Sequence, residues 1–542
     1  MPLARWLVAF ALAAWSAGCA SLPANVGRVE THAFATPEQT ALGRLVQQRR
    51  SQDHAHAESA FHLLDNADEA FSARVALIDG AQQGLDLQYY AIHADNTTEV
   101  LLEHLRDAAR RGVRVRVLLD DFNTVGTDAQ VLRLAFEPNV QIRLFNPLPG
   151  SRASLIGRVI TSLHDFDRLQ KRMHNKMFIA DSAMGITGGR NLGDAYFGGD
   201  GKSSFVDLEV LAAGKVVRDM SASFDRYWND PLAYPMQTLV TPQQLEELRT
   251  PAPSQESEAT HVPANAIPLP SATASSSVLP ASTPTAVASI DDRPADLARM
   301  SLAWAPSLLL ADQPGKIGPD DDEADAGETV VDGLLQLMQQ ARQDILIVSP
   351  YFVPGEQMMR AFAQLRSKGI HVRVLTNSLA SNDALAAHAG YAHYRRRLLA
   401  LGVELNEMRA NPQGIDAHGG PGIGSGGGSK SGASRASLHS KVVVIDGRFC
   451  VIGSMNLDLR SQRKNSEVAL LIRSRTISQL ASRRIEETIG HAAYRLETAY
   501  GELVWRAPPG APYKDAHNEP EASTKLRVLA SVIAPFAPDE ML

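Results

Sequence analysis

The 542-residue chain has little cysteine, no excess of positive charge and no long hydrophobic run. Its two cysteines, Cys19 and Cys450, exclude a disulfide framework. General nucleic-acid binders carry an excess of basic residues, whereas this chain has a net charge of −7, so no nucleic-acid partner is expected. The apolar run over residues 6–15 is too short to span a bilayer. With 44% hydrophobic residues, the chain can still bury the cores of two or three globular domains.

The N-terminus has the pattern of a cleaved leader. Arg5 precedes the apolar run, which ends in small residues directly before Cys19. This arrangement resembles a bacterial lipoprotein signal, in which cleavage leaves the cysteine as a lipidated first residue. We expect a signal peptide over residues 1–18 and a membrane-proximal segment over 19–60; an ordinary cleaved signal and a retained anchor are the alternatives. The resemblance implies a bacterial cell-envelope location, as a membrane-anchored lipoprotein that faces the periplasm.

Two tracts of biased composition divide the rest of the chain. Residues 250–298 are rich in proline, serine, alanine and threonine, a composition that buries too little apolar surface to fold. They predict a linker between a first lobe over 61–249 and a second lobe over 299–508. The glycine- and serine-rich residues 414–437 predict a flexible insertion in the second lobe, and residues 509–542 a C-terminal tail.

The two halves carry the same order of predicted elements. In the first half, a strand over 85–90, a helix over 99–111 ended by Gly112, and a strand over 113–117 follow one another. The second half repeats them as a strand over 345–348, a helix over 357–368 ended by Gly369, and a strand over 370–374. Two β-α-β units predict two similar α/β lobes with largely parallel sheets.

Each half also carries a His-x-Lys pattern, followed at fixed spacing by aspartate, glycine and asparagine. The first copy is His174, Lys176, Asp181, Gly188 and Asn191; the second is His439, Lys441, Asp446, Gly453 and Asn456. Residues 177–180 and 442–445 predict strands, and residues two apart on a strand share a face. The turns that follow predict hairpins, each returning its asparagine beside its own histidine and lysine.

The duplicated set suits the chemistry of a phosphodiester. Lys176 and Lys441 can neutralise the nonbridging oxygens, while Asn191 and Asn456 donate hydrogen bonds to them. One imidazole can attack phosphorus, and the other can protonate the leaving alkoxide and then activate the second acceptor. A lysine two residues from each histidine would repel a divalent ion, so neither a metal nor another cofactor is expected.

Four acidic residues receive supporting roles. Asp181 and Asp446 are placed with the catalytic set, although aspartates at such turns commonly bind backbone amides. Glu209 and Glu467 follow the two motifs, and we expect them to hold the histidine tautomers by accepting hydrogen bonds from the imidazoles.

Together these residues resemble the paired motif of the phospholipase D superfamily, over about residues 63–506. The stretches 188–197, 349–355 and 381–383, followed by His388 and Tyr391, are similar to bacterial cardiolipin synthases of the C type. The resemblance implies two phospholipase D-like α/β lobes related by a pseudo-twofold axis, with the active site at their interface. It implies a phosphatidyltransferase that makes cardiolipin through a covalent phosphohistidine, with His174 as nucleophile and His439 as acid.

The partners implied are membrane phospholipids, namely phosphatidylglycerol with phosphatidylethanolamine as a further candidate. A phospholipase D that releases phosphatidic acid would use the same first half-reaction and is one alternative. A phosphodiesterase or nuclease of the same superfamily is another, and a non-enzymatic membrane-associated protein is a third. No motif sets the acceptor, the inner or outer membrane, or the oligomeric state.

Overall fold

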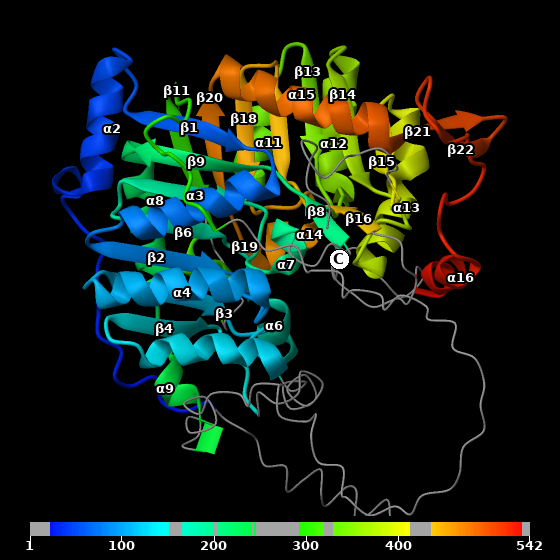
Figure 1. The fold of residues 1–542 in the computed structure, drawn as a ribbon. Coiled ribbons are helices and arrows are strands. Elements are labelled where there is room, and N and C mark those ends of the chain that lie inside the picture. Colours follow the sequence, from blue (N-terminus) through cyan, green and yellow to red (C-terminus); the bar gives the residue numbers. More distant parts are fainter. Residues whose placement is uncertain are drawn as a thin grey trace, which may run out of the picture.

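The computed structural model describes residues 22–150, 165–198, 203–240, 243–244, 292–318, 329–411 and 435–533. The expected signal peptide, Cys19, linker residues 250–291 and insertion residues 414–434 lie outside this set. Within the described residues the two halves of the chain form two large sheets, which lie side by side (Figure 1).

The first sheet combines eight strands of the first half with one that follows the linker. In spatial order its strands are β10 (Ala233–Pro235), β4 (Val140–Phe145), β3 (Arg114–Asp120), β2 (Gly84–Tyr89), β6 (Met177–Ala180), β7 (Met184–Gly188), β9 (Glu209–Gly214), β1 (Ser59–Leu64) and β11 (Ala303–Trp304). The helices of this half are α2 (Ala41–Gln52), α3 (Ala67–Gly80), α4 (Asn96–Arg110), α6 (Phe166–Gln170), α7 (Asp194–Phe197), α8 (Lys215–Trp228) and α9 (Met236–Leu239).

The second sheet repeats the central order of the first. Its strands are β12 (Ser307–Ala311), β20 (Val468–Arg473), β18 (Phe449–Gly453), β17 (Val442–Ile445), β13 (Asp344–Val348), β14 (His371–Asn377), β15 (Glu404–Met408), β21 (Ala493–Ala499) and β22 (Glu502–Arg506). The helices of this half are α11 (Val330–Met338), α12 (Gly355–Ser367), α13 (Leu385–Ala400), α14 (Leu459–Arg463), α15 (Arg475–Ala492) and α16 (Thr524–Ile533). The central order β4-β3-β2-β6-β7-β9-β1 thus corresponds to β15-β14-β13-β17-β18-β20-β12, as a pseudo-twofold relation of the lobes requires.

The predicted β-α-β units and motif strands are confirmed, but the predicted parallel character of the sheets is wrong. Only β2–β3 and β3–β4 are parallel in the first sheet, and only β13–β14 and β14–β15 in the second, among the described pairings. The reason lies in the motif hairpins. A turn of three residues, 181–183 or 446–448, can join only antiparallel strands, and each hairpin inserts its strands beside β2 or β13.

Alternating side chains on the motif strands separate three layers of core. Phe178 and Ala180 face the outer core of the first lobe, while Met177 and Ile179 face a central core shared by both lobes. On the other lobe, Val442 and Val444 enter the same central core, whereas Val443 and Ile445 face the outer core of the second lobe. Helices α8 and α15 pack in the central layer, and each also contacts a strand of the opposite lobe. This shared core holds the two motifs close together.

Three expected domain boundaries shift. The segment expected to be membrane-proximal packs on the first lobe from residue 22 onward, and Leu42 and Val46 of α2 enter its core. Residues 292–304 also run along the first lobe, so the second lobe begins at β12 rather than at residue 299. Residues 509–533 of the expected tail dock on the second lobe. No helix within the described ranges combines the length and apolar composition that a bilayer crossing needs.

Candidate active site

The two motif hairpins have the same turn. Asp181 and Ser182 adopt φ values of 54° and 53°, and Asp446 and Gly447 adopt 53° and 57°. Positive φ at both central residues is the signature of a type I′ turn, which matches the twist of the flanking strands. The hairpins therefore follow from local sequence.

Asp181 and Asp446 do not belong to the catalytic set, which corrects their expected placement. The Asp181 carboxylate accepts the backbone N–H groups of residues 82–84 at 2.7–3.2 Å. Asp446 accepts those of residues 342–344 at 2.8–3.2 Å. Each aspartate thus anchors the start of strand β2 or β13 at the turn end of its hairpin. Their role is structural.

His174 precedes β6 and is held by a carboxylate from the other lobe. Its Nδ1 lies 3.0 Å from both carboxylate oxygens of Glu467, as expected for that glutamate. The hydroxyls of Ser454 and Ser461 also donate to Glu467, at 2.5 and 2.8 Å. With Nδ1 engaged, Nε2 of His174 is left for the reaction.

His439 is held in the mirror-image way, but not by the glutamate that was expected. Its Nδ1 lies 3.0 Å from Oδ2 of Asp207. Glu209 is paired instead with Arg74, at 2.7 and 2.9 Å, and with Arg190 at 3.3 Å. The prediction for Glu209 is therefore wrong: it neutralises two buried arginines, and Asp207 takes the role at His439.

Strand register explains the difference of two residues. Gly188 lies opposite Glu209 in the first lobe, and Gly453 lies opposite Ala469 in the second. The counterpart of Glu467 is therefore Asp207, two residues before Glu209.

Short strands that cross between the lobes create this exchange of carboxylates. Strand β5 (Arg172–Met173), just before His174, pairs in parallel with β19 (Asn465–Ser466), just before Glu467. Strand β16 (Arg435–Leu438), just before His439, pairs in parallel with β8 (Ser203–Val206), just before Asp207. Each lobe thus supplies the carboxylate that orients the other lobe's histidine.

Both lysines are buried beside their histidines. Lys176 Nζ donates to the backbone oxygen of His174 at 2.8 Å, and Lys441 Nζ to that of His439 at 2.5 Å. Burial lowers the pKa of Lys176 to about 7 and that of Lys441 to about 8. Each ammonium group has been moved out of water and has no direct carboxylate partner among the described residues, which disfavours its charged form.

The histidines are neutral in the free protein for the same reason. Burial lowers the pKa of His174 to about 4, against the opposing pull of Glu467. Burial, and then Lys441, Lys176 and His174, lower the pKa of His439 well below its usual value. These mutual effects place the two motifs in one site. A bound phosphodiester would reverse the repulsion, because its negative charge favours the protonated form of every one of these groups.

The two asparagines are not equivalent. Asn191 accepts from the backbone N–H of Ala91 at 3.3 Å and donates to the Tyr196 hydroxyl at 2.9 Å. Within the described residues, Oδ1 of Asn456 is buried and has no hydrogen-bond partner. Both lie at the ends of returning motif strands, in the position that the hairpin pattern predicts.

An aromatic wall that sequence reasoning did not identify covers the imidazoles. Tyr90 makes an edge contact with His174 at a ring distance of 5.1 Å. Tyr196 and Phe205 contact His439 at ring distances of 5.4 and 4.8 Å. The two histidines are consequently only 8% and 6% exposed. Their positions in the sequence could have indicated that Tyr90 and Tyr196 lie at the site, because Tyr90 directly follows β2 and Tyr196 lies in the 188–197 stretch.

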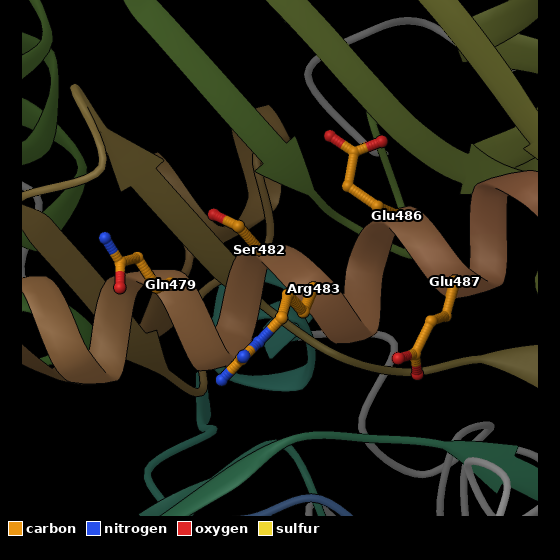
Figure 2. Close-up of a pocket in the computed structure, with 5 residues that line it drawn as sticks. All are labelled: Gln479, Ser482, Arg483, Glu486 and Glu487. Carbon is orange, nitrogen blue, oxygen red and sulfur yellow. The ribbon is translucent and has the colours of Figure 1, made fainter.

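A separate surface hollow of about 580 Å³ lies on α15 and is unrelated to this site (Figure 2). Its lining side chains come from this one helix and are polar: Gln479, Ser482, Arg483, Glu486 and Glu487. None of them belongs to the two motifs.

Two lobes of similar fold that each supply one His-x-Lys motif to a shared site agree with the expected phospholipase D-like architecture. Comparison with known proteins agrees. The family described as "Cardiolipin synthase, PLD-like domain" matches residues 75–228 and 334–489. This chain belongs to that family, and it is a phosphatidyltransferase of the phospholipase D superfamily.

Relatives cover most of the chain. Cardiolipin synthase C of Escherichia coli is 35% identical over 446 residues, which is 82% of this chain and 87% of that protein. A cardiolipin synthase of Geobacillus kaustophilus is 24% identical over 460 residues, 83% of this chain and 70% of that protein. The crystal structure of phosphatidylserine synthase from Haemophilus influenzae has the same fold, with a TM-score of 0.54 at 14% identity, and covers 92% of this chain and 100% of that one.

Proposed function

We propose that this chain makes cardiolipin from phosphatidylglycerol and a second phospholipid, through a phosphatidyl group held on a histidine. One observation carries the proposal: two buried imidazoles share a site, and a carboxylate holds Nδ1 of each one. One imidazole can therefore act as nucleophile while the other moves a proton. The similarity to cardiolipin synthases supports the choice of lipid substrates.

In the first half-reaction, Nε2 of His174 attacks the phosphorus of the donor phospholipid, and the bond to the headgroup oxygen breaks. His174 is suited to this step because its low pKa keeps its lone pair free at neutral pH. The bound phosphodiester favours protonation of His439, which gives its proton to the departing headgroup alcohol. Lys176 and Lys441 stabilise the charge on the nonbridging oxygens.

In the second half-reaction, His439 is neutral and takes the proton from a glycerol hydroxyl of phosphatidylglycerol. The hydroxyl oxygen attacks phosphorus, the bond to His174 breaks, and cardiolipin leaves. His439 has regained its proton for the next donor. Atoms balance with one headgroup alcohol released for each cardiolipin made.

The shielding of the histidines favours an alcohol over water as the acceptor. Tyr90, Tyr196 and Phe205 contact the imidazoles, which leaves little imidazole surface exposed. A long lipid acceptor would gain binding contacts along its length, which water cannot make. Hydrolysis to phosphatidic acid is the competing outcome of the same intermediate.

The test uses purified protein with vesicles of phosphatidylethanolamine and phosphatidylglycerol, the latter with a ¹³C-labelled headgroup. We expect mass spectrometry to find cardiolipin whose bridging glycerol carries the label. His174→Ala and His439→Ala should form none, and His491→Ala, at an exposed histidine on α15, should be fully active. Phosphatidic acid without cardiolipin would contradict transfer.

We further propose that the protein is a lipoprotein of the bacterial cell envelope that faces the periplasm, with lipid on Cys19. The lipoprotein-like leader supports this, and an anchored enzyme meets its lipid substrate at high effective concentration. Cys19→Ser should shift the protein from the membrane to the soluble fraction after cell lysis in high salt. Membrane association that depends neither on Cys19 nor on salt would contradict the lipid anchor.

A further inference from the structure

The C-terminal helix α16 carries apolar side chains on two opposite faces. Leu526, Ala530 and Ile533, at helical spacing, pack against the second lobe. Val528, Leu529 and Val532 point away from it and are 57%, 45% and 56% exposed. Exposed apolar side chains that lie together on one helix face mark an interaction surface, so the outer stripe is a candidate binding site.

This helix is fixed in orientation. Directly before it, Glu521 accepts the Arg409 guanidinium at 2.7 Å and the backbone N–H groups of Ala410 and Asn411 at 2.8 and 3.1 Å. Glu519 pairs with the buried Arg395. Two anchors and an apolar inner face therefore hold the outer stripe in place.

The helix lies one loop away from the catalytic site. Figure 1 shows α16, in red, at the end of the second lobe where β16 and α13 also lie. Its inner face packs against Leu379, Ala380 and Leu385. The same loop carries Asp383, whose carboxylate accepts the Tyr351 hydroxyl at 2.9 Å and acts electrostatically on Lys441.

The charge of the helix matches an anionic lipid surface. Residues 524–533 contain Lys525 and Arg527 and no acidic residue, in a chain whose net charge is −7. Lys525 is exposed next to the outer stripe. A helix with apolar side chains and flanking basic groups is the kind that lies in the interface of a bilayer, with its apolar face sunk about 5–10 Å.

We infer that Val528, Leu529 and Val532 form a membrane-docking stripe, which inserts into an anionic phospholipid surface and holds the loop that carries Asp383 against it. The inference rests on the proposed function, since a phospholipid substrate makes the bilayer the partner. Docking would let a lipid headgroup reach the buried histidines without leaving the bilayer.

The test measures binding of the full chain to vesicles of phosphatidylglycerol and phosphatidylethanolamine by flotation. Every protein carries Cys19→Ser, so that no acyl chain hides the difference. The triple variant Val528→Ser, Leu529→Ser, Val532→Ser should bind on the order of 10- to 100-fold more weakly, because three apolar side chains no longer enter the interface. The control Val26→Ser, Val29→Ser alters side chains that are 64% and 66% exposed elsewhere, and it should bind as the parent does.

Activity separates docking from chemistry. On vesicles the triple variant should lose cardiolipin synthesis in proportion to its binding, whereas on short-chain phosphatidylglycerol below its micelle concentration it should match the parent. Leu529→Trp adds a direct reporter, whose emission should shift to the blue on vesicles and be quenched by brominated acyl chains.

Three results would be decisive against docking: unchanged vesicle binding of the triple variant, no quenching of the new tryptophan, or a lipid-free dimer of the parent that the triple variant dissociates. The last would make the stripe a contact between copies of the chain. Failure of the proposed function looks different, since the parent would make no cardiolipin from either substrate while the binding difference persisted.

Discussion

Replacing Lys176 by methionine should stabilise the protein while it removes activity. The side chain is 1% exposed, and Nζ donates to the backbone oxygen of His174 at 2.8 Å. A pKa lowered from 10.5 to about 7 corresponds to about 5 kcal/mol by which the folded state disfavours the ammonium form. Methionine has a similar length and no charge, and it loses one hydrogen bond worth about 1 kcal/mol. We expect a net gain of about 2–4 kcal/mol below pH 7.

The gain should depend on pH with a definite sign. The unfolded lysine keeps its proton up to about pH 10.5, whereas the folded one releases it near pH 7. The wild type therefore carries the full penalty below pH 7, and the penalty shrinks by about 1.4 kcal/mol per pH unit above it. At pH 9.5 the two proteins should differ by about 1 kcal/mol or less.

Calorimetric melting at pH 6.5 and pH 9.5 measures both effects. At the size of one lobe, about 2 kcal/mol corresponds to roughly 4 °C or more in Tm. Activity should fall on the order of 100-fold or more, because the phosphoryl group loses a preorganised charge. A variant that melts lower than wild type at pH 6.5, or a difference independent of pH, would refute the reasoning.

Lys316→Met is the matched control. Lys316 is also buried, but its Nζ donates to Asp312 Oδ2 at 2.6 Å and to the backbone oxygen of Ser461 at 2.8 Å. The substitution leaves a buried carboxylate without its counter-ion, so it should destabilise by about 3 kcal/mol. The same chemical change should thus have opposite signs at the two positions.

Three further predictions test the site. Asp207→Asn should lower kcat roughly 100- to 10,000-fold, because the His439 tautomer is no longer correctly oriented. Glu209→Gln should lower Tm more than kcat, because it breaks buried ion pairs. The reverse pattern would show that Glu209, not Asp207, orients His439. Binding of dimethyl phosphate, a monoanion throughout, should weaken above about pH 7 as Lys176 and then Lys441, with pKa values of about 7 and about 8, lose their protons. Tighter binding at pH 9 than at pH 6.5 would contradict this. Asp446→Ala removes the acceptor of three backbone N–H groups, so it should lower the free energy of unfolding in urea by about 2–3 kcal/mol. Its kcat should stay within a few-fold of the wild-type value. A large loss of kcat would show that Asp446 takes part in the chemistry.

The hairpins and their histidines were predictable because the information is local. Strands 177–180 and 442–445 have the predicted bounds, and each is followed by a turn pair that accepts positive φ. Aspartate and glycine tolerate that conformation, and the repetition of the whole pattern removed the ambiguity of a single copy.

The partner of His439 was not predictable because it depends on contacts between the lobes. Asp207 and Glu209 are two residues apart in a stretch of extended character, so alternation of side chains cannot separate them. The choice is made where β8 pairs with β16 and the N–H of His439 bonds to the backbone oxygen of Val206. Spacing was no guide either, because 33 residues separate His174 from Asp207 and 28 separate His439 from Glu467.

The exchange of carboxylates makes the two repeats an isologous dimer joined in one chain. A single repeat would hold a histidine but no carboxylate to orient it, so it could complete a site only by pairing with a second copy about a twofold axis. Covalent linkage fixes the concentration of that partner and also frees the two surfaces to differ. The two surfaces already differ at one pair of equivalent positions. Ser454 donates its hydroxyl to Glu467, whereas its counterpart is Gly189, where any Cβ would lie 2.4 Å from Asp207. In a dimer of identical subunits, the nucleophile and the acid would have the same surrounding residues. In the joined repeats, the residues around each histidine can differ, so each histidine can be suited to one of the two roles.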